Sequence, residues 1–269
     1  MRPNHFCRVI IASFMSFGIL ACSGTFAAAF PTQTGPAPTE TVAAPPPPAT
    51  PTPPVTLSSV SLHEENQNPT YEIKAQVPAL DGNPDPRVIN FNTAMMNFVN
   101  MEINKFRKDV SELAPAAYSV SPGSFLDVTY ALTLQRSDLW SFKFNFSGYF
   151  AGAAHPYLYS LTVNYDLGQG RELTLSDLFL PNSNYLEAIS NHCTAELNKR
   201  DIGFATFPHG AEPASENYLN WNITTDGLMI TFDEGMVAAY AAGPQTVVVP
   251  YSELQAITNP AGPLAGINP

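Results

Sequence analysis

The chain has 269 residues, with 23 acidic and 12 basic side chains and a formal net charge of −11. Charged residues make up only 13% of the chain and hydrophobic residues 45%, which excludes a disordered polyampholyte and a coiled coil. An acidic chain without clustered Lys or Arg repels phosphate backbones, so nucleic acid is not an expected partner.

Residues 1–21 have the pattern of an export signal. A short basic start precedes an apolar run at 9–20, which is too short for a stable membrane-spanning helix. The run ends in small residues before Cys22, which resembles the bacterial lipoprotein box. We therefore expect a lipoprotein signal peptide at 1–21 and a lipidated Cys22 that anchors the chain to the outer face of a bacterial membrane. Plain secretion, with cleavage after one of the alanines at 27–29, is the alternative.

A stalk is predicted at 22–56, because the segment from Pro31 to Pro54 holds ten of the 26 prolines. Proline lacks an N–H donor and has a fixed φ, so this Pro/Thr/Ala-rich segment favours disorder or extended polyproline II. Patterned globular sequence follows at 57–257, and residues 258–269 are expected to form a flexible tail.

The first half of this domain predicts two strands and a long helix. Residues 57–63 and 70–77 alternate weakly and indicate strands. Asp85 is a typical N-cap and Pro86 suits the first helical turn. Apolar residues then recur mostly every third or fourth position as far as Leu113, which predicts an amphipathic helix.

The second half is dominated by strand signals. Alternating apolar residues predict strands at 128–134, 140–146 and 159–165, a hairpin at 221–232 and a short β segment at 246–249. A second helix is expected at 184–199. These elements indicate an α+β fold: a mainly antiparallel sheet with a long N-terminal-half helix and a second helix packed on one face.

Six short segments together resemble the RsiV/PdaC-type extracytoplasmic domain, long catalogued as a domain of unknown function. They lie in order at 152–156, 164–168, 170–179, 226–232, 240–243 and 249–254. The resemblance covers residues 145–257, so we divide the domain into halves at 57–145 and 146–257. It implies a non-catalytic module of the kind found in a lysozyme-binding anti-sigma factor and in some peptidoglycan deacetylases. The anti-sigma role and the deacetylase activity themselves are not expected here.

Residues 231–235, Thr-Phe-Asp-Glu-Gly, superficially resemble the metal-binding motif of polysaccharide deacetylases. That chemistry needs two histidine ligands beside its aspartates. The histidines, at positions 5, 63, 155, 192 and 209, have no paired spacing. We therefore predict no catalytic residue, no metal and no cofactor.

Ligand binding is assigned to His155, Tyr157, Asp233, Glu234 and Tyr240. For His155, the alternative is a structural hydrogen bond to the backbone that holds its loop. Cys193 lies on the apolar side of the second helix, which predicts a buried, unreactive thiol.

The resulting hypothesis is a non-enzymatic, membrane-anchored lipoprotein of the cell envelope. Its exported domain would bind a protein or cell-wall ligand, such as a basic lysozyme-type protein or peptidoglycan. One alternative is a hydrolase or deacetylase that acts on cell-wall glycans through Asp233 and Glu234. The other is a structural accessory protein of an envelope complex.

Overall fold

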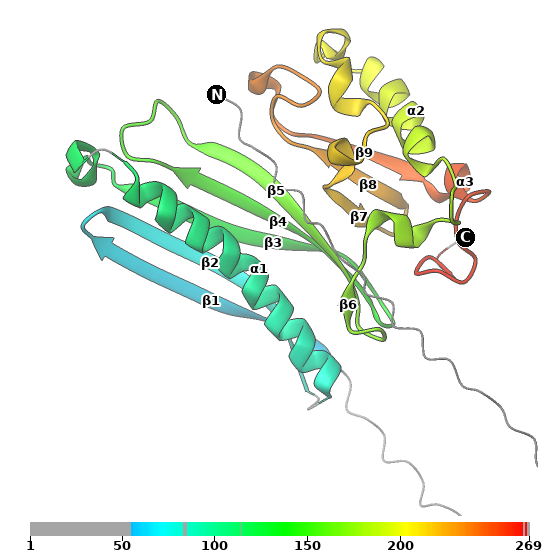
Figure 1. Ribbon diagram of the computed structural model, residues 1–269, viewed down its shortest axis with the longest axis horizontal. Helices are drawn as coiled ribbons and strands as arrows, with labels where there is room; N and C mark the ends of the chain where they lie inside the picture. Colours follow the sequence, from blue (N-terminus) through cyan, green and yellow to red (C-terminus); the bar gives the residue numbers. More distant parts are fainter. Residues whose placement is uncertain (1–54, 83–84, 114, 266, 268–269) are drawn as a thin grey trace, which may run out of the picture. The chain divides into compact units, whose positions relative to one another are not determined.

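The computed structural model describes residues 55–82, 85–113, 115–265 and 267 (Figure 1). The predicted signal peptide, Cys22 and nearly all of the predicted stalk lie outside these residues. No helix in the described part of the chain is both long enough and apolar enough to cross a membrane.

The larger sheet has six strands in chain order (Figure 1). They are β1 (Thr56–Gln67), β2 (Thr70–Asp81), β3 (Ser124–Arg136), β4 (Leu139–Tyr149), β5 (Tyr157–Asp166) and β6 (Arg171–Glu172). Neighbouring strands are antiparallel except β2 and β3, which run parallel. The long helix α1 (Pro86–Ser111) provides the crossover that a parallel pair requires.

Helix α1 begins as its sequence predicts. The Asp85 carboxylate accepts the Arg87 N–H at 2.8 Å, and Pro86 occupies the first turn. The apolar side of α1 is buried against the sheet, and its buried residues are Val88, Phe91, Met95, Val99, Ile103, Phe106 and Val110. Opposite them lie the aromatic residues at even positions of β4, from Trp140 to Phe146.

A second, three-stranded antiparallel sheet follows in the C-terminal half. It consists of β7 (Trp221–Ile223), β8 (Gly227–Phe232) and β9 (Gln245–Pro250), with α2 (Tyr185–Asn198) and α3 (Tyr251–Leu254) beside it (Figure 1). The 3-10 helices are η1 (Pro115–Ser119), η2 (Leu175–Leu178), η3 (Phe204–Thr206), η4 (Pro208–Ala211), η5 (Ser215–Tyr218) and η6 (Tyr240–Ala242).

The α+β class and the antiparallel-rich sheet are as expected, but the placement of the helices is not. Helix α1 packs on the six-stranded sheet, whereas the buried side of α2 packs in a separate core with β7–β9. The expectation of two helices on one face of a single sheet is therefore wrong. The strand alternation correctly indicated one buried face of β4, but it did not reveal that the smaller sheet covers part of the other.

Buried polar side chains join the two sheets. Asn164 of β5 donates to the Trp221 carbonyl at 2.8 Å, and its Oδ1 accepts the Ser141 hydroxyl at 2.6 Å. Asn222 of β7 donates to the Phe142 carbonyl at 2.9 Å. Since all three polar side chains are nearly inaccessible to water, these bonds hold β7 in one position against β4 and β5.

The predicted flexible tail at 258–269 is also corrected. Thr258 forms a β-bridge with Phe179, and the Asn259 N–H donates to the Leu178 carbonyl at 3.0 Å. Leu264 and Ile267 are buried in the C-terminal core. The Pro- and Gly-rich composition indicated irregular backbone, but burial of these two apolar side chains holds the described part of the segment in place.

Asp177 caps the turn at η2. Its carboxylate accepts the Thr174 N–H at 2.7 Å and pairs with Arg171 at 2.9 Å. The hydrogen bond from Arg171, opposed by partial burial and aided by Thr174, lowers the pKa of Asp177 from 3.8 to about 2.

Asp177→Asn is expected to lower the free energy of unfolding at neutral pH by about 1 kcal/mol, because Arg171 is partly exposed and solvent weakens the pair. The ionised carboxylate stabilises the fold above its ordinary pKa. That contribution disappears as the pH falls from about 4 to about 2. Urea unfolding of both proteins across this range should show their difference shrinking. A constant difference would contradict a role for the ionised group.

Candidate functional site

The start of β5 and the segment after β8 meet at one end of the molecule. The loop before β5 contains Gly152, whose φ of +87° favours glycine, and the exposed His155. The His155 ring lies 5.6 Å, between centroids, from the half-exposed ring of Tyr240. Its Nδ1 lies 2.9 Å from the Pro156 carbonyl, which is the backbone contact considered as its structural role. His155 therefore both holds its loop and contacts the η6 turn.

Asp233 follows β8 and is bonded to β5. One carboxylate oxygen accepts the Ser160 N–H at 2.9 Å, and the other accepts the Asn220 side-chain amide at 3.2 Å. Burial raises the pKa of Asp233, although the bond from Ser160 acts in the opposite direction. The side chain thus satisfies an outward-facing amide of β5 and connects the two sheets.

Glu234 points its carboxylate toward the same cluster. A hydrogen bond between Glu234 and the Tyr240 hydroxyl raises the pKa of Tyr240. The other oxygen, Oε2, is buried and has no hydrogen-bond partner among the described residues. An acceptor without a donor is costly in a low-dielectric environment, so this buried oxygen is an unsatisfied group beside the exposed pair of His155 and Tyr240.

Tyr157, the fifth predicted residue, lies on the opposite face of β5. Successive side chains of a strand alternate between faces, so Tyr157 and Tyr159 point toward α1 while Ser160 points toward the smaller sheet. The Tyr157 ring stacks on Phe150 with centroids 5.3 Å apart. The structure therefore brings together His155, Asp233, Glu234 and Tyr240 but separates Tyr157 from them.

The sequence reasoning missed Lys143 of β4. Its half-buried side chain lies on the same sheet face as Asp233, and burial lowers the pKa of its ammonium while the charge of Asp233 opposes that shift. A lysine between Phe142 and Phe144 was available as a signal. It was not selected, because nothing in the strand pattern indicated a second layer on this face of β4.

The described histidines do not form a nucleophile–base pair. His192 contacts Glu253 at 2.7 Å and the Val248 carbonyl at 3.1 Å, so it does not pair with the neighbouring Cys193. Cys193 is fully buried, and burial raises its pKa to about 12, which confirms the expected unreactive thiol. His209 pairs with Glu212 at the surface.

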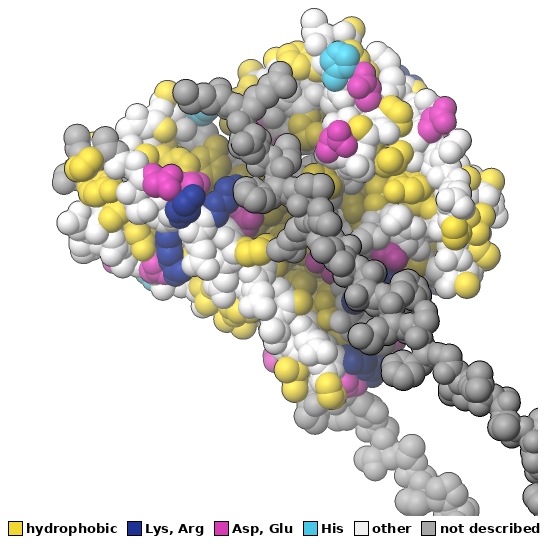
Figure 2. Space-filling view, in the orientation of Figure 1, with side chains coloured by type: hydrophobic (Ala, Val, Ile, Leu, Met, Phe, Trp, Pro, Cys, Tyr) yellow, Lys and Arg dark blue, Asp and Glu magenta, His cyan; other side chains and the backbone are white. Residues whose placement is uncertain are grey.

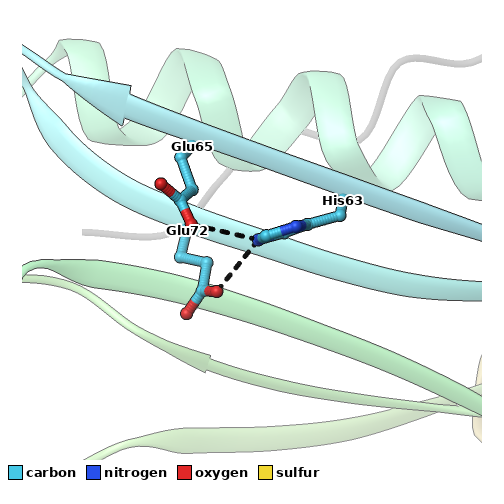
Figure 3. A group of neighbouring side chains, drawn as sticks. All are labelled: His63, Glu65 and Glu72. Atoms are coloured by element: carbon cyan, nitrogen blue, oxygen red, sulfur yellow. Dashed lines mark hydrogen bonds and ion pairs between the residues drawn. The ribbon is translucent and has the colours of Figure 1, made fainter.

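A group of metal-ligand types, not anticipated from the sequence, lies on the β1–β2 hairpin (Figure 3). His63 Nε2 is 3.0 Å from Glu72 and 3.4 Å from Glu65, which faces Glu72 directly across the hairpin. The Lys74 ammonium also binds Glu72, at 2.6 Å. Because the group is mostly exposed and the charge of Glu72 is already paired with Lys74, its geometry indicates a surface ion-pair network. The sequence did not indicate this group, because only the register of the hairpin places Glu65 opposite Glu72.

Comparison with known proteins places this architecture. Residues 176–252 match the family described as "Protein of unknown function (DUF3298)". A solved DUF3298 structure from Bacteroides fragilis has a TM-score of 0.60 at 17% identity, covering 80% of this chain and 97% of that one. The chain contains a DUF3298-like domain.

Two curated relatives share parts of the DUF3298-like chain. The peptidoglycan-N-acetylmuramic acid deacetylase PdaC of Bacillus subtilis is 27% identical over 169 residues, covering 62% of this chain and 36% of PdaC. An esterase of Mycobacterium tuberculosis is 31% identical over 105 residues, covering 38% of this chain and 45% of the esterase. The chain therefore spans less than half the length of either relative. The RsiV/PdaC-type resemblance seen in the sequence is confirmed at the level of the domain.

Proposed function

We propose that the DUF3298-like domain is a non-enzymatic binding module of the bacterial cell envelope, tethered to the outer face of a membrane through lipidated Cys22. The observation that carries this proposal is the bonding of Asp233. Each oxygen of Asp233 accepts a hydrogen bond, one from Ser160 of the larger sheet and one from the Asn220 side chain before β7. These bonds link the two sheets, which favours a structural role for this carboxylate.

The groups left for a partner are those of a recognition surface. His155 and Tyr240 are exposed and in contact, and the partly exposed Glu234 beside them adds a negative charge. The chain carries a net charge of −11, which attracts a basic partner over a distance of about one Debye length, ~8–10 Å at moderate salt. A basic protein of the lysozyme type, or an amine-bearing peptidoglycan fragment, has the complementary charge.

The names of the two curated relatives favour a second candidate, an enzyme that removes acetyl groups from cell-wall glycan or hydrolyses esters. Asp233 would then be its acidic residue, and its raised pKa would suit a proton carrier. The two candidates predict different behaviour for an isosteric change at Asp233.

Asp233→Asn keeps one oxygen to accept the Ser160 N–H, so we expect a loss of stability of about 1 kcal/mol or less. Asp233→Ala removes both acceptors and should cost about 1–3 kcal/mol. Urea unfolding of the full-length chain in mild detergent measures both. Hydrolysis of peptidoglycan or of an aryl ester that disappears in the folded Asp233→Asn protein would contradict the proposal.

Binding is tested on the same full-length chain with hen lysozyme by calorimetry. We expect binding at low salt that weakens at least tenfold when the salt is raised, because long-range attraction is screened. Glu234→Gln should weaken lysozyme binding at low salt. Glu187→Gln removes the same charge from an exposed position on α2 and is the matched control. Failure of lysozyme and of peptidoglycan fragments to bind at low salt would overturn the binding role.

The membrane tether has its own test. The lipid anchor on Cys22 should place the wild-type chain in the detergent phase of a phase separation, and Cys22→Ala should move it to the aqueous phase. An unchanged partition would exclude the anchor.

A further inference from the structure

A groove lies between α1 and the beginning of β5, on the sheet face opposite the Asp233 cluster. It encloses about 240 Å³. Its aromatic side consists of Phe106, Phe150, Tyr157 and Tyr159, and its charged side of Glu102, Lys105 and Asp109 of α1. Side chains of both charges gather over α1 in the space-filling view (Figure 2).

The aromatic side is a rigid wall. Phe106 stacks on Phe150 with centroids 5.6 Å apart, and Tyr157 follows at 5.3 Å from Phe150. Tyr159 continues the series and stacks on Phe146 at 4.8 Å. Rings packed in this way lose little side-chain entropy on binding, so the wall is preorganised.

The charged side is acidic at both ends. Glu102 and Asp109 lie seven residues apart and therefore on one side of α1. Glu102 accepts the Tyr159 hydroxyl at 2.8 Å. Asp109 forms no side-chain hydrogen bond or ion pair with any residue that the structure describes. Burial, aided by Asp109 and Glu102, raises the pKa of Tyr157 to about 12, so the ring hydroxyl remains protonated.

One ammonium group already occupies part of the groove. Lys105 Nζ lies 5.9 Å from the centroid of the Tyr159 ring. The electron-rich face of an aromatic ring attracts cations at this distance. Lys105 thus shows that an ammonium group fits against the tyrosine rings. The Asp109 carboxylate, farther along α1, has no cationic partner among the described residues.

We propose that this groove binds a lysine or arginine side chain of a basic partner protein, with the cation between the tyrosine rings and the carboxylates of Glu102 and Asp109. This inference rests on the proposed binding function and identifies a second contact for the same partner. A cation satisfies both features of the groove, the aromatic wall and the unpaired carboxylate. A neutral sugar would leave the carboxylate uncompensated.

The test uses the full-length chain and a pentalysine amide, with Nε-acetylated pentalysine as the uncharged probe of equal length. We expect the charged peptide to bind and the acetylated one not to bind. Asp109→Asn should weaken pentalysine binding about 3- to 5-fold, the upper part of the range for a partly exposed charge pair. Asp127→Asn is the matched control, since it removes the same charge from an exposed position on β3 and should change binding less than about twofold.

Tyr159 separates the contribution of the ring from that of charge. Tyr159→Phe keeps the aromatic face and should bind pentalysine within about twofold of wild type. Tyr159→Leu should weaken binding about fivefold, as expected for a lost cation–π contact. Thermal unfolding shows whether each variant is folded, and Asp109→Asn decides the question independently if Tyr159→Leu is not.

Three results would overturn the groove assignment. Equal effects of Asp109→Asn and Asp127→Asn would indicate attraction by net charge alone. Binding of tetra-N-acetylchitotetraose that is lost in Tyr159→Leu, without loss of pentalysine binding, would indicate a neutral glycan site. If lysozyme binds Asp109→Asn and Tyr159→Leu as tightly as it binds the wild type, the groove is rejected but the binding function stands. If only Glu234→Gln loses lysozyme binding, the partner binds the other face of the sheet.

Discussion

Replacing Phe91 by alanine is expected to lower the free energy of unfolding by about 3–5 kcal/mol, the range for a large aromatic side chain removed from a packed core. Phe91 is 0% exposed. Its ring contacts those of Tyr165 at 5.1 Å, Phe142 at 5.8 Å and Trp140 at 6.3 Å. Truncation leaves a cavity between α1 and the centre of the six-stranded sheet, and rigid aromatic neighbours cannot collapse to fill it.

Urea unfolding of Phe91→Ala and of Ile89→Ala measures this effect. Ile89 lies on the same helix but is 56% exposed, so its truncation should change stability by about 0.5 kcal/mol or less. A loss below about 1 kcal/mol for Phe91→Ala would show that α1 does not depend on this packing in solution.

The second large effect is expected at the polar contact between the sheets. Asn164→Leu should cost about 2–4 kcal/mol, because it removes hydrogen bonds from several buried groups. The Ser141 hydroxyl loses its acceptor and the Trp221 carbonyl loses the Asn164 amide, while the Ile223 N–H keeps only its bond to Ser141. Leucine has the same branching as asparagine but bulkier methyl groups, so overpacking adds to the loss of hydrogen bonding at this buried position.

Hydrogen exchange gives the more specific measurement for Asn164→Leu. The amide of Ile223 should exchange faster than in the wild type. Amides in the middle of α1 should lose only the protection that corresponds to the drop in global stability. Asn145→Leu, an exposed change on β4, should have a small effect. Uniform loss of protection in both sheets would contradict a local role for this network.

The contact between the sheets also determines the candidate site. Asp233 follows a strand of the smaller sheet and Ser160 belongs to the larger one, yet they are bonded at 2.9 Å. A change that loosens Asn164 should therefore weaken ligand binding as well as stability. Phe91→Ala, on the opposite face of the sheet, should affect binding at the Asp233 cluster only through the loss of stability.

Local signals predicted the elements well. Alternating aromatics predicted the strand now seen as β4, and the apolar spacing after Asp85 predicted a helix where α1 lies. Both rest on backbone geometry, since a strand repeats every two residues and a helix about every 3.6. The Asp85 N-cap was placed correctly for the same reason, because a cap involves only neighbouring residues.

Site residues were predicted less completely. His155, Asp233, Glu234 and Tyr240 were selected and lie together, but Tyr157 of the same set points toward α1. The groove partners Glu102 and Asp109 were missed because they are more than 45 residues away from β5 in the sequence. Neighbours of that kind are set by packing, which leaves no local pattern.

The sequence by itself determined the acidic charge, the composition break after the proline-rich segment, and which side chains share a face of each helix and strand. Only the tertiary structure decided what covers each face: α1 on one side of the six-stranded sheet and, across a polar contact at Ser141 and Asn164, the smaller sheet on part of the other. The physical reason is that periodicity follows from local backbone geometry, whereas the covering layer is chosen by long-range burial and hydrogen bonding between distant segments.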